Sequence, residues 1–110
     1  MSYSVKTLPD FDKGVKRIAK KHKGVKSDIA KLINDLEDNP LLGANIGENL
    51  YKIRLSISGT NKGKSGGARV ITYVVVVNEI VYLSEIYLKS EADTVDPDLI
   101  VQHLKDNGII

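Results

Sequence analysis

The stretch GARVITYVVVVNEIVYLSEIYL, residues 67–88, decides the fold class. Its first half, residues 67–77, is rich in β-branched side chains and almost entirely apolar, which is typical of a central strand buried on both faces. Asn78 and Glu79 predict a tight turn, and residues 80–88 predict a strand that returns beside the first. The stretch therefore predicts a β-hairpin at the centre of the fold.

A third strand is predicted just before this hairpin. From residue 50 to residue 58, apolar side chains alternate with polar or basic ones, which places Lys52 and Arg54 on one face. The other face carries Tyr51, Ile53, Leu55 and Ile57. We therefore expect an antiparallel meander with a basic face.

The N-terminal third has helical spacing instead. Apolar side chains recur at helical intervals over residues 9–22 and again over residues 25–37. Gly24 separates the two segments, and Asn39-Pro40 ends the second. This pattern predicts a helical hairpin.

Two short elements complete the expected fold. Residues 3–8 could form a strand, and Asp96-Pro97-Asp98 predicts the start of a helix over residues 97–107. We expect one α+β domain over residues 1–110, in which an N-terminal helical hairpin packs on a small antiparallel sheet and a short C-terminal helix follows. The helices are expected to cover one face of the sheet.

Composition excludes several classes of site. The chain has no cysteine, and its two histidines lie far apart, so we expect no metal site and no cofactor. His22 and His103 are predicted to be structural. The longest apolar run, residues 74–77, is too short to cross a bilayer, and no signal peptide is evident, so we expect a cytoplasmic protein.

Positive charge is concentrated in the middle of the chain. Residues 47–71 contain five basic side chains and one acid, whereas the chain from Glu79 onward contains seven acids and two lysines. A polyanion would therefore meet the middle segment.

The segment Gly59–Ser65 resembles a nucleotide-binding loop but fails two requirements. Three residues, not four, separate its first glycine from Gly-Lys-Ser, and a strand follows where a helix should receive the phosphates. Two interpretations remain: a flexible hairpin loop whose lysines aid solubility, or a site for a different phosphate. Arg69, on an apolar strand, needs a partner, either Glu85 or an external phosphate.

Three segments in this order resemble the sheet of bacterial type II toxin–antitoxin toxins of the RelE/ParE superfamily, in particular its HigB-like branch. They are LYKIR at residues 50–54, GKSGGARVITY at 63–73 and YLSEIYLKSE at 82–91. The resemblance implies an endoribonuclease that cuts mRNA on the ribosome, inhibits translation and is held inactive by an antitoxin encoded beside it.

The resemblance also implies which residues form the site. Arg69, Lys64, Tyr87 and Lys89 would be catalytic, and Arg54, Lys52 and Tyr73 would bind RNA. Apart from the resemblance, Lys62 in the same loop as Lys64 is a further candidate for RNA binding. The sequence departs from the family pattern at Thr72 and Leu88. Such a site needs no metal, because Arg69 could neutralise the phosphate in the transition state while Lys64, Lys89 or Tyr87 moves protons.

Two alternatives remain open: a toxin of the same fold that acts by binding a protein such as gyrase, as the ParE branch does, and an inactive module that only binds an antitoxin or nucleic acid. The basic set of Arg54, Lys64 and Arg69 favours the nuclease.

The predicted hairpin poses one geometric difficulty. A two-residue turn at Asn78-Glu79 would put Tyr87 on the opposite face of the sheet from Arg69. If both belong to one site, the sheet must contain a β-bulge, or irregular backbone near residues 65–68, and we expect one.

Overall fold

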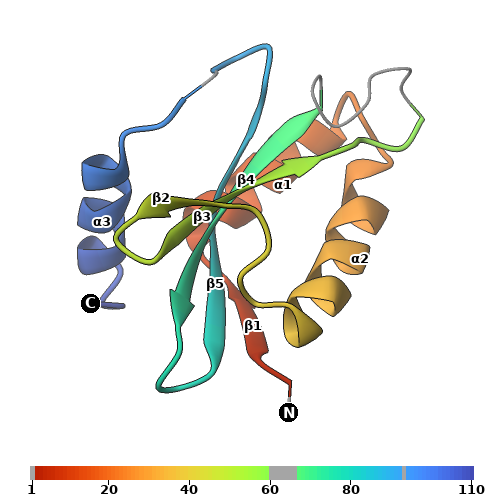
Figure 1. The fold of residues 1–110 in the computed structure, drawn as a ribbon. Helices are drawn as coiled ribbons and strands as arrows, with labels where there is room; N and C mark the ends of the chain where they lie inside the picture. The colour runs from red at the N-terminus through yellow and green to blue at the C-terminus, as the bar shows by residue number, and fades with distance from the viewer. Residues whose placement is uncertain (1, 60–66, 93) are drawn as a thin grey trace.

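The structure, a computed structural model, describes residues 2–59, 67–92 and 94–110. Within these ranges a five-stranded sheet lies between a helical hairpin and a single C-terminal helix (Figure 1). In chain order the elements are β1 (Ser4–Thr7), α1 (Pro9–Ala19), α2 (Val25–Asp38), β2 (Ala44–Gly47), β3 (Leu50–Leu55), β4 (Ala68–Val75), β5 (Ile80–Leu88) and α3 (Pro97–Asp106). The predicted α+β class and the order of helices are confirmed.

The sheet has the strand order β1-β5-β4-β3-β2. Neighbouring strands are antiparallel except β1, which pairs parallel to β5 at one edge. The predicted antiparallel meander is confirmed in β3, β4 and β5, but the prediction did not specify that β1 pairs parallel to β5. It also missed β2, since Ala44–Gly47 is only four residues long, shows no alternation and lies between Gly43 and Glu48, which both have positive φ.

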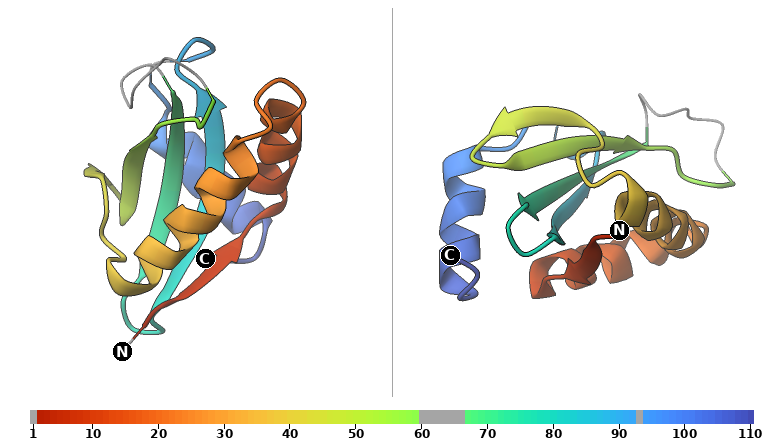
Figure 2. Two further views of the ribbon diagram at one scale, coloured as in Figure 1. Left: turned by 90° about the vertical axis from the view of Figure 1, so that its right-hand side faces the viewer. Right: turned by 60° about the horizontal axis from the view of Figure 1, so that its bottom comes forward.

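The helical hairpin forms the larger core with one face of the sheet. Phe11 and Ile18 of α1 and Leu36 of α2 are at most 2% exposed and pack with residues such as Val70 and Leu83. Each such side chain contributes about 1.5–3 kcal/mol of hydrophobic stabilisation. In Figure 2, α1 and α2 lie together on this side of the sheet.

The C-terminal helix lies on the other face, contrary to the prediction that the helices cover one face. Ile100 and Leu104 of α3 pack with Leu50, Ile71 and Tyr87 in a second apolar cluster. Helical periodicity identifies the apolar side of a helix but not the sheet face that it meets, and β4 is apolar on both faces. The start of α3 is as predicted, because the Asp96 carboxylate accepts a hydrogen bond from the Asp98 N–H at 3.0 Å.

A β-bulge in β5 sets which side chains share a face. Near the turn, Val75 pairs with Ile80 and Thr72 with Leu83, but Ile71 pairs with Glu85, so that Ser84 is the extra residue. The predicted bulge is therefore present, and it lies in β5. It places Arg69 directly opposite Tyr87 on one face.

No helix within the described ranges is long and apolar enough to cross a membrane.

Gly67 is required by the packing of β3 against the chain that enters β4. A Cβ atom there would lie 2.1 Å from the Leu55 carbonyl oxygen, which is backbone and cannot rotate away. The backbone of Leu55 and Ser56 therefore fills the space in which a side chain of residue 67 would lie.

We therefore expect Gly67→Ala to destabilise the fold by about 1–3 kcal/mol, as overpacking usually does. Urea unfolding would measure the effect. At Gly59 a Cβ meets nothing within 4 Å and only the positive φ of 85° opposes a side chain, so Gly59→Ala should cost less. An equal loss of stability in both variants would contradict the packing argument.

Candidate functional site

Three of the predicted site residues form a row across three strands. Arg54 of β3 pairs with Arg69 of β4, and Arg69 pairs in turn with Tyr87 of β5. Directly opposite residues have Cβ atoms about 4.5–5.5 Å apart, so the three side chains leave the same face as neighbours. Two arginines and a tyrosine therefore share one face of the sheet, and Tyr87 reaches this face because of the bulge at Ser84.

Solvent reaches only one end of this row. Arg69 is 3% and Tyr87 8% exposed, whereas Arg54 is exposed to solvent. Arg69 Nη1 donates to the Ala68 carbonyl oxygen at 3.2 Å, and Tyr87 belongs to the apolar cluster beneath α3. A ligand would meet Arg54 first.

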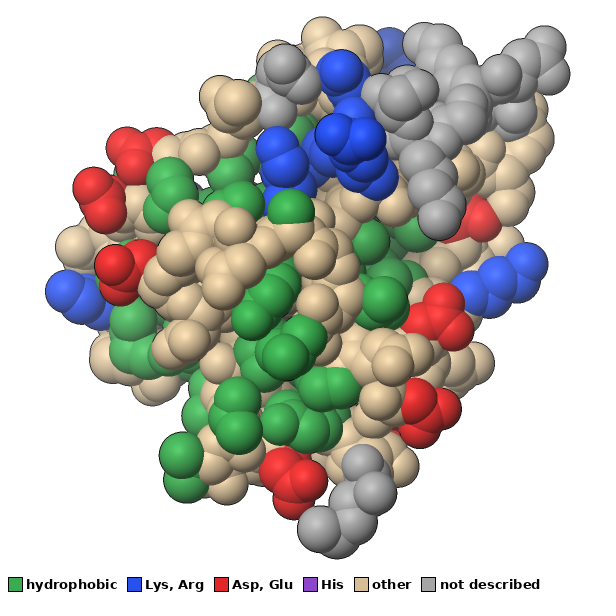
Figure 3. Space-filling view, in the orientation of Figure 1, with side chains coloured by type: hydrophobic (Ala, Val, Ile, Leu, Met, Phe, Trp, Pro, Cys, Tyr) green, Lys and Arg blue, Asp and Glu red, His purple; other side chains and the backbone are tan. Residues whose placement is uncertain are grey.

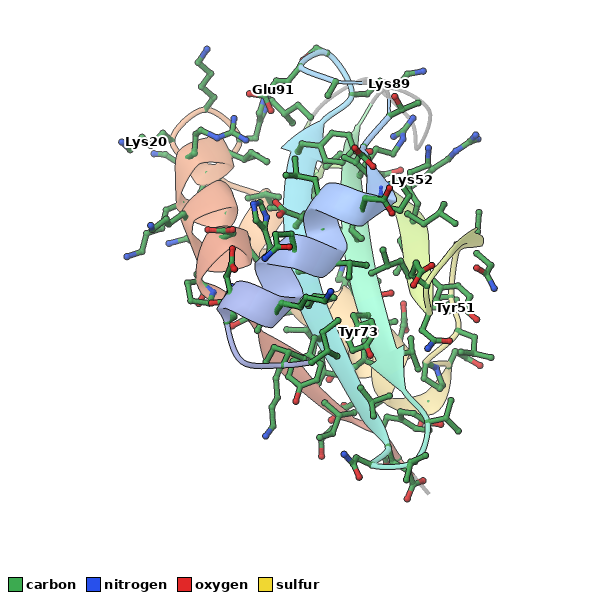
Figure 4. The ribbon with its side chains drawn as sticks, turned by 90° about the vertical axis from the view of Figure 1, so that its left-hand side faces the viewer. Lys20, Tyr51, Lys52, Tyr73, Lys89 and Glu91 are labelled. Atoms are coloured by element: carbon green, nitrogen blue, oxygen red, sulfur yellow. The ribbon has the colours of Figure 1, made fainter. Side chains whose placement is uncertain are left out.

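Lys52 and Tyr73 extend the same face away from the row. Lys52 pairs with Ile71, and Tyr73 lies opposite Leu50 on β3 and Tyr82 on β5. The Tyr73 and Tyr82 rings are stacked, with centroids 6.3 Å apart. In Figure 4, Lys52 lies nearer than Tyr73 to the end of the sheet where Lys89 is found.

A surface groove of about 340 Å³ borders Lys52 and Arg54. Leu42, Gly43, Ala44 and Ile53 complete its lining. Figure 3 shows Lys and Arg side chains gathered above an apolar area, at the end of the sheet where β3 finishes and β4 starts. The exposed end of the row therefore opens onto a groove with positive charge at its edge.

Lys89 follows directly after β5 and continues its register. Its N–H donates to the Gly67 carbonyl oxygen at 3.0 Å, one step beyond the pair Ala68–Leu88. The remaining two predicted residues, Lys62 and Lys64, lie outside the described residues.

Glu91 anchors the turn that carries Lys89. Its carboxylate accepts a hydrogen bond from the Leu88 N–H at 3.0 Å and forms an ion pair with Arg17 of α1. The Leu88 N–H, followed by Arg17, lowers the pKa of the Glu91 carboxyl group. The turn is thereby connected to the helical hairpin.

Asp28 fixes the chain that leaves β3 in the direction of residues 60–66. This aspartate of α2 is 7% exposed, and its carboxylate accepts hydrogen bonds from the Ser58 N–H, at 2.8 Å, and from the Ser58 hydroxyl group. A buried carboxylate with two donors is a stable anchor.

A histidine also lies on the site face, which the sequence did not predict. His103 Nδ1 lies 3.0 Å from Glu85 Oε1 and 3.5 Å from Asp10 Oδ2. The hydrogen bond with Glu85 is the largest cause that raises the His103 pKa. Glu85, which we considered as a partner of Arg69, therefore contacts α3.

Comparisons with known proteins give a family match over most of the chain. Residues 11–105 match the family model of the RelE toxin of the RelE/RelB toxin–antitoxin system. No curated protein matched the chain.

Among solved structures, the chain is similar to a free-state mutant of the E. coli toxin RelE, with a TM-score of 0.59 and 17% identity over 84% of this chain and 90% of that one. At this identity the likeness shows the fold alone, whereas the family match extends from α1 to α3. The chain belongs to the family of RelE toxins of RelE/RelB toxin–antitoxin systems.

Proposed function

We propose that this chain, acting as a single domain, is a ribosome-dependent, HigB-like mRNA endoribonuclease that inhibits translation in the cytoplasm. An antitoxin encoded beside it would hold it inactive. The observation that carries the proposal is the row Arg54–Arg69–Tyr87, in which two cations and a phenol share one sheet face.

The row suits RNA cleavage by the neighbouring 2′-hydroxyl group. That oxygen attacks the phosphorus, a phosphorane with an additional negative charge forms, and the 5′-oxygen leaves with a proton. A guanidinium group such as Arg69 stabilises the developing charge through planar, charge-assisted hydrogen bonds. Arg54 lies beside it and would hold the same or the next phosphate.

Proton transfer is assigned to the groups at the far end of the row. Tyr87 is opposite Arg69, and Lys89 follows it two residues later. Lys64, outside the described residues, completes the proposed set. These side chains need no divalent ion for the reaction, because charge neutralisation comes from arginine.

The groove beside Lys52 and Arg54 is the proposed entry for the mRNA strand. Its positive edge would attract phosphates, and Tyr73 offers an aromatic surface further along the same face on which a base could stack. A toxin that binds gyrase has no need for paired guanidinium groups on its sheet, so the row favours RNA as the target.

Mapping new 5′ ends in cellular RNA after induction would test the proposal. We expect cuts in mRNA coding regions within minutes of induction, before growth stops, and none after induction of Arg69→Ala. Growth arrest with intact mRNA would contradict the nuclease proposal and point to a protein target such as gyrase.

A further inference from the structure

Three potential metal ligands from three separate elements meet beside the site. Asp10 is in the first turn of α1, Glu85 is on β5 and His103 is on α3. One ligand atom from each lies within 4.8 Å of the other two. His103 Nδ1 lies 3.0 Å from Glu85 Oε1 and 3.5 Å from Asp10 Oδ2.

We propose that Asp10, Glu85 and His103 form a binding site for a divalent transition-metal ion, with Zn²⁺ as the best fit. Imidazole nitrogen and carboxylate oxygen are ligands that Zn²⁺ accepts at about 2.0–2.2 Å. Tetrahedral bonds of that length place neighbouring ligands about 3.4 Å apart, close to the two distances from Nδ1. Small side-chain rotations would therefore bring all three atoms to one ion.

Charge and exposure agree with this occupant. Two carboxylates that converge on one point repel each other, and a divalent cation would neutralise both. The side chains of Asp10 and His103 are 44% and 37% exposed, so an ion can enter and water can occupy the remaining coordination position. Glu85, at 24%, forms the more buried wall.

The competing occupant is a proton. With the imidazole protonated, His103 would bridge the two carboxylates as an ion pair and no metal would be needed. Both occupants explain the short distances, but they predict different responses to added Zn²⁺, because a protonated Nδ1 cannot bind a metal.

A bound ion would fasten α3 to the rest of the fold. Ile100 and Leu104 pack α3 on the sheet. A metal ion held by the three ligands would also connect α3 to β5 and to α1. Because Glu85 is two residues from Tyr87, the same link would fix the helix that covers the buried end of the row. The metal site itself does not depend on the proposed nuclease function.

Thermal unfolding of the purified full chain with ZnCl₂ tests the site. Above the dissociation constant, each tenfold increase in Zn²⁺ should raise Tm by about 5 °C. His103→Gln should abolish this shift, whereas His22→Gln, which alters the other histidine of the chain, should retain it. An equal shift in both variants, or no shift in the unaltered chain, would overturn the proposal.

Two further measurements keep the test decisive if His103→Gln folds poorly. Glu85→Gln preserves the size of the side chain and should weaken Zn²⁺ binding at least tenfold in calorimetry. Co²⁺ should give a visible absorption band that Zn²⁺ displaces. Binding unaffected by Glu85→Gln, or Co²⁺ without such a band, would mean that the three side chains form only an ion-pair network.

Discussion

Replacing Arg69 with alanine is expected to abolish growth arrest when the protein is induced. The guanidinium group lies at the centre of the row, opposite Arg54 on one side and Tyr87 on the other. Loss of one group that stabilises transition-state charge typically lowers kcat about 100- to 1,000-fold. Cleavage at that rate would no longer outpace mRNA synthesis. Growth curves and primer extension on a cleaved transcript would measure the loss.

Because Arg69 is 3% exposed, the control must separate chemistry from folding. Circular dichroism and capture by the antitoxin should show that Arg69→Ala is folded. Arg69→Lys keeps the charge but loses the planar pair of donors, so it should retain partial activity. Lys6→Ala removes an exposed cation from β1, at the other edge of the sheet, and should leave toxicity unchanged. A folded and fully toxic Arg69→Ala variant would remove this residue from the site.

Local patterns predicted those parts of the fold in which one short segment determines its own structure. The alternation at residues 50–55 correctly placed Lys52 and Arg54 on one face, because a strand has a strict period of two. The Asp96-Pro97 start of α3 was correct for a similar reason, since a cap and a first-turn proline act within four residues. The length of the turn between β4 and β5 was not predicted correctly. Residues 76–79 connect the two strands, where a two-residue turn was expected.

Long-range features of the site could be predicted only indirectly. The bulge at Ser84 has no signature in the sequence, and it was inferred only because Arg69 and Tyr87 had to share a face if both belong to the site. The burial of Tyr87 depends on the packing of α3 on its face of the sheet, which helical periodicity does not specify. The same limit explains why the contact between His103 and Glu85 was missed, because the two residues are 18 positions apart in the chain and lie in different elements, α3 and β5.

Removing the start codon from a reporter transcript is expected to protect that transcript from cleavage in cells that express the toxin. Arg69 and Tyr87 are 3% and 8% exposed, so free RNA has poor access to the groups proposed for catalysis, while Arg54 and Lys52 can still hold a phosphate at the groove. A ribosome that presents the mRNA in a bent and fixed conformation would supply the alignment of 2′-hydroxyl, phosphorus and leaving oxygen. Such alignment can be worth about 7–11 kcal/mol.

The matched transcripts should differ only in the start codon, and cleavage should be followed by mapping 5′ ends after induction. We expect cuts confined to the translated frame in the intact transcript, and at least a tenfold loss of cleavage in the untranslated one. Cells that express Arg69→Ala together with the translated transcript give the background level of cleavage by cellular nucleases. Equal cleavage of both transcripts above that background would show that the free protein aligns RNA by itself, and the ribosome-dependent mechanism would then be wrong even if Arg69 is essential.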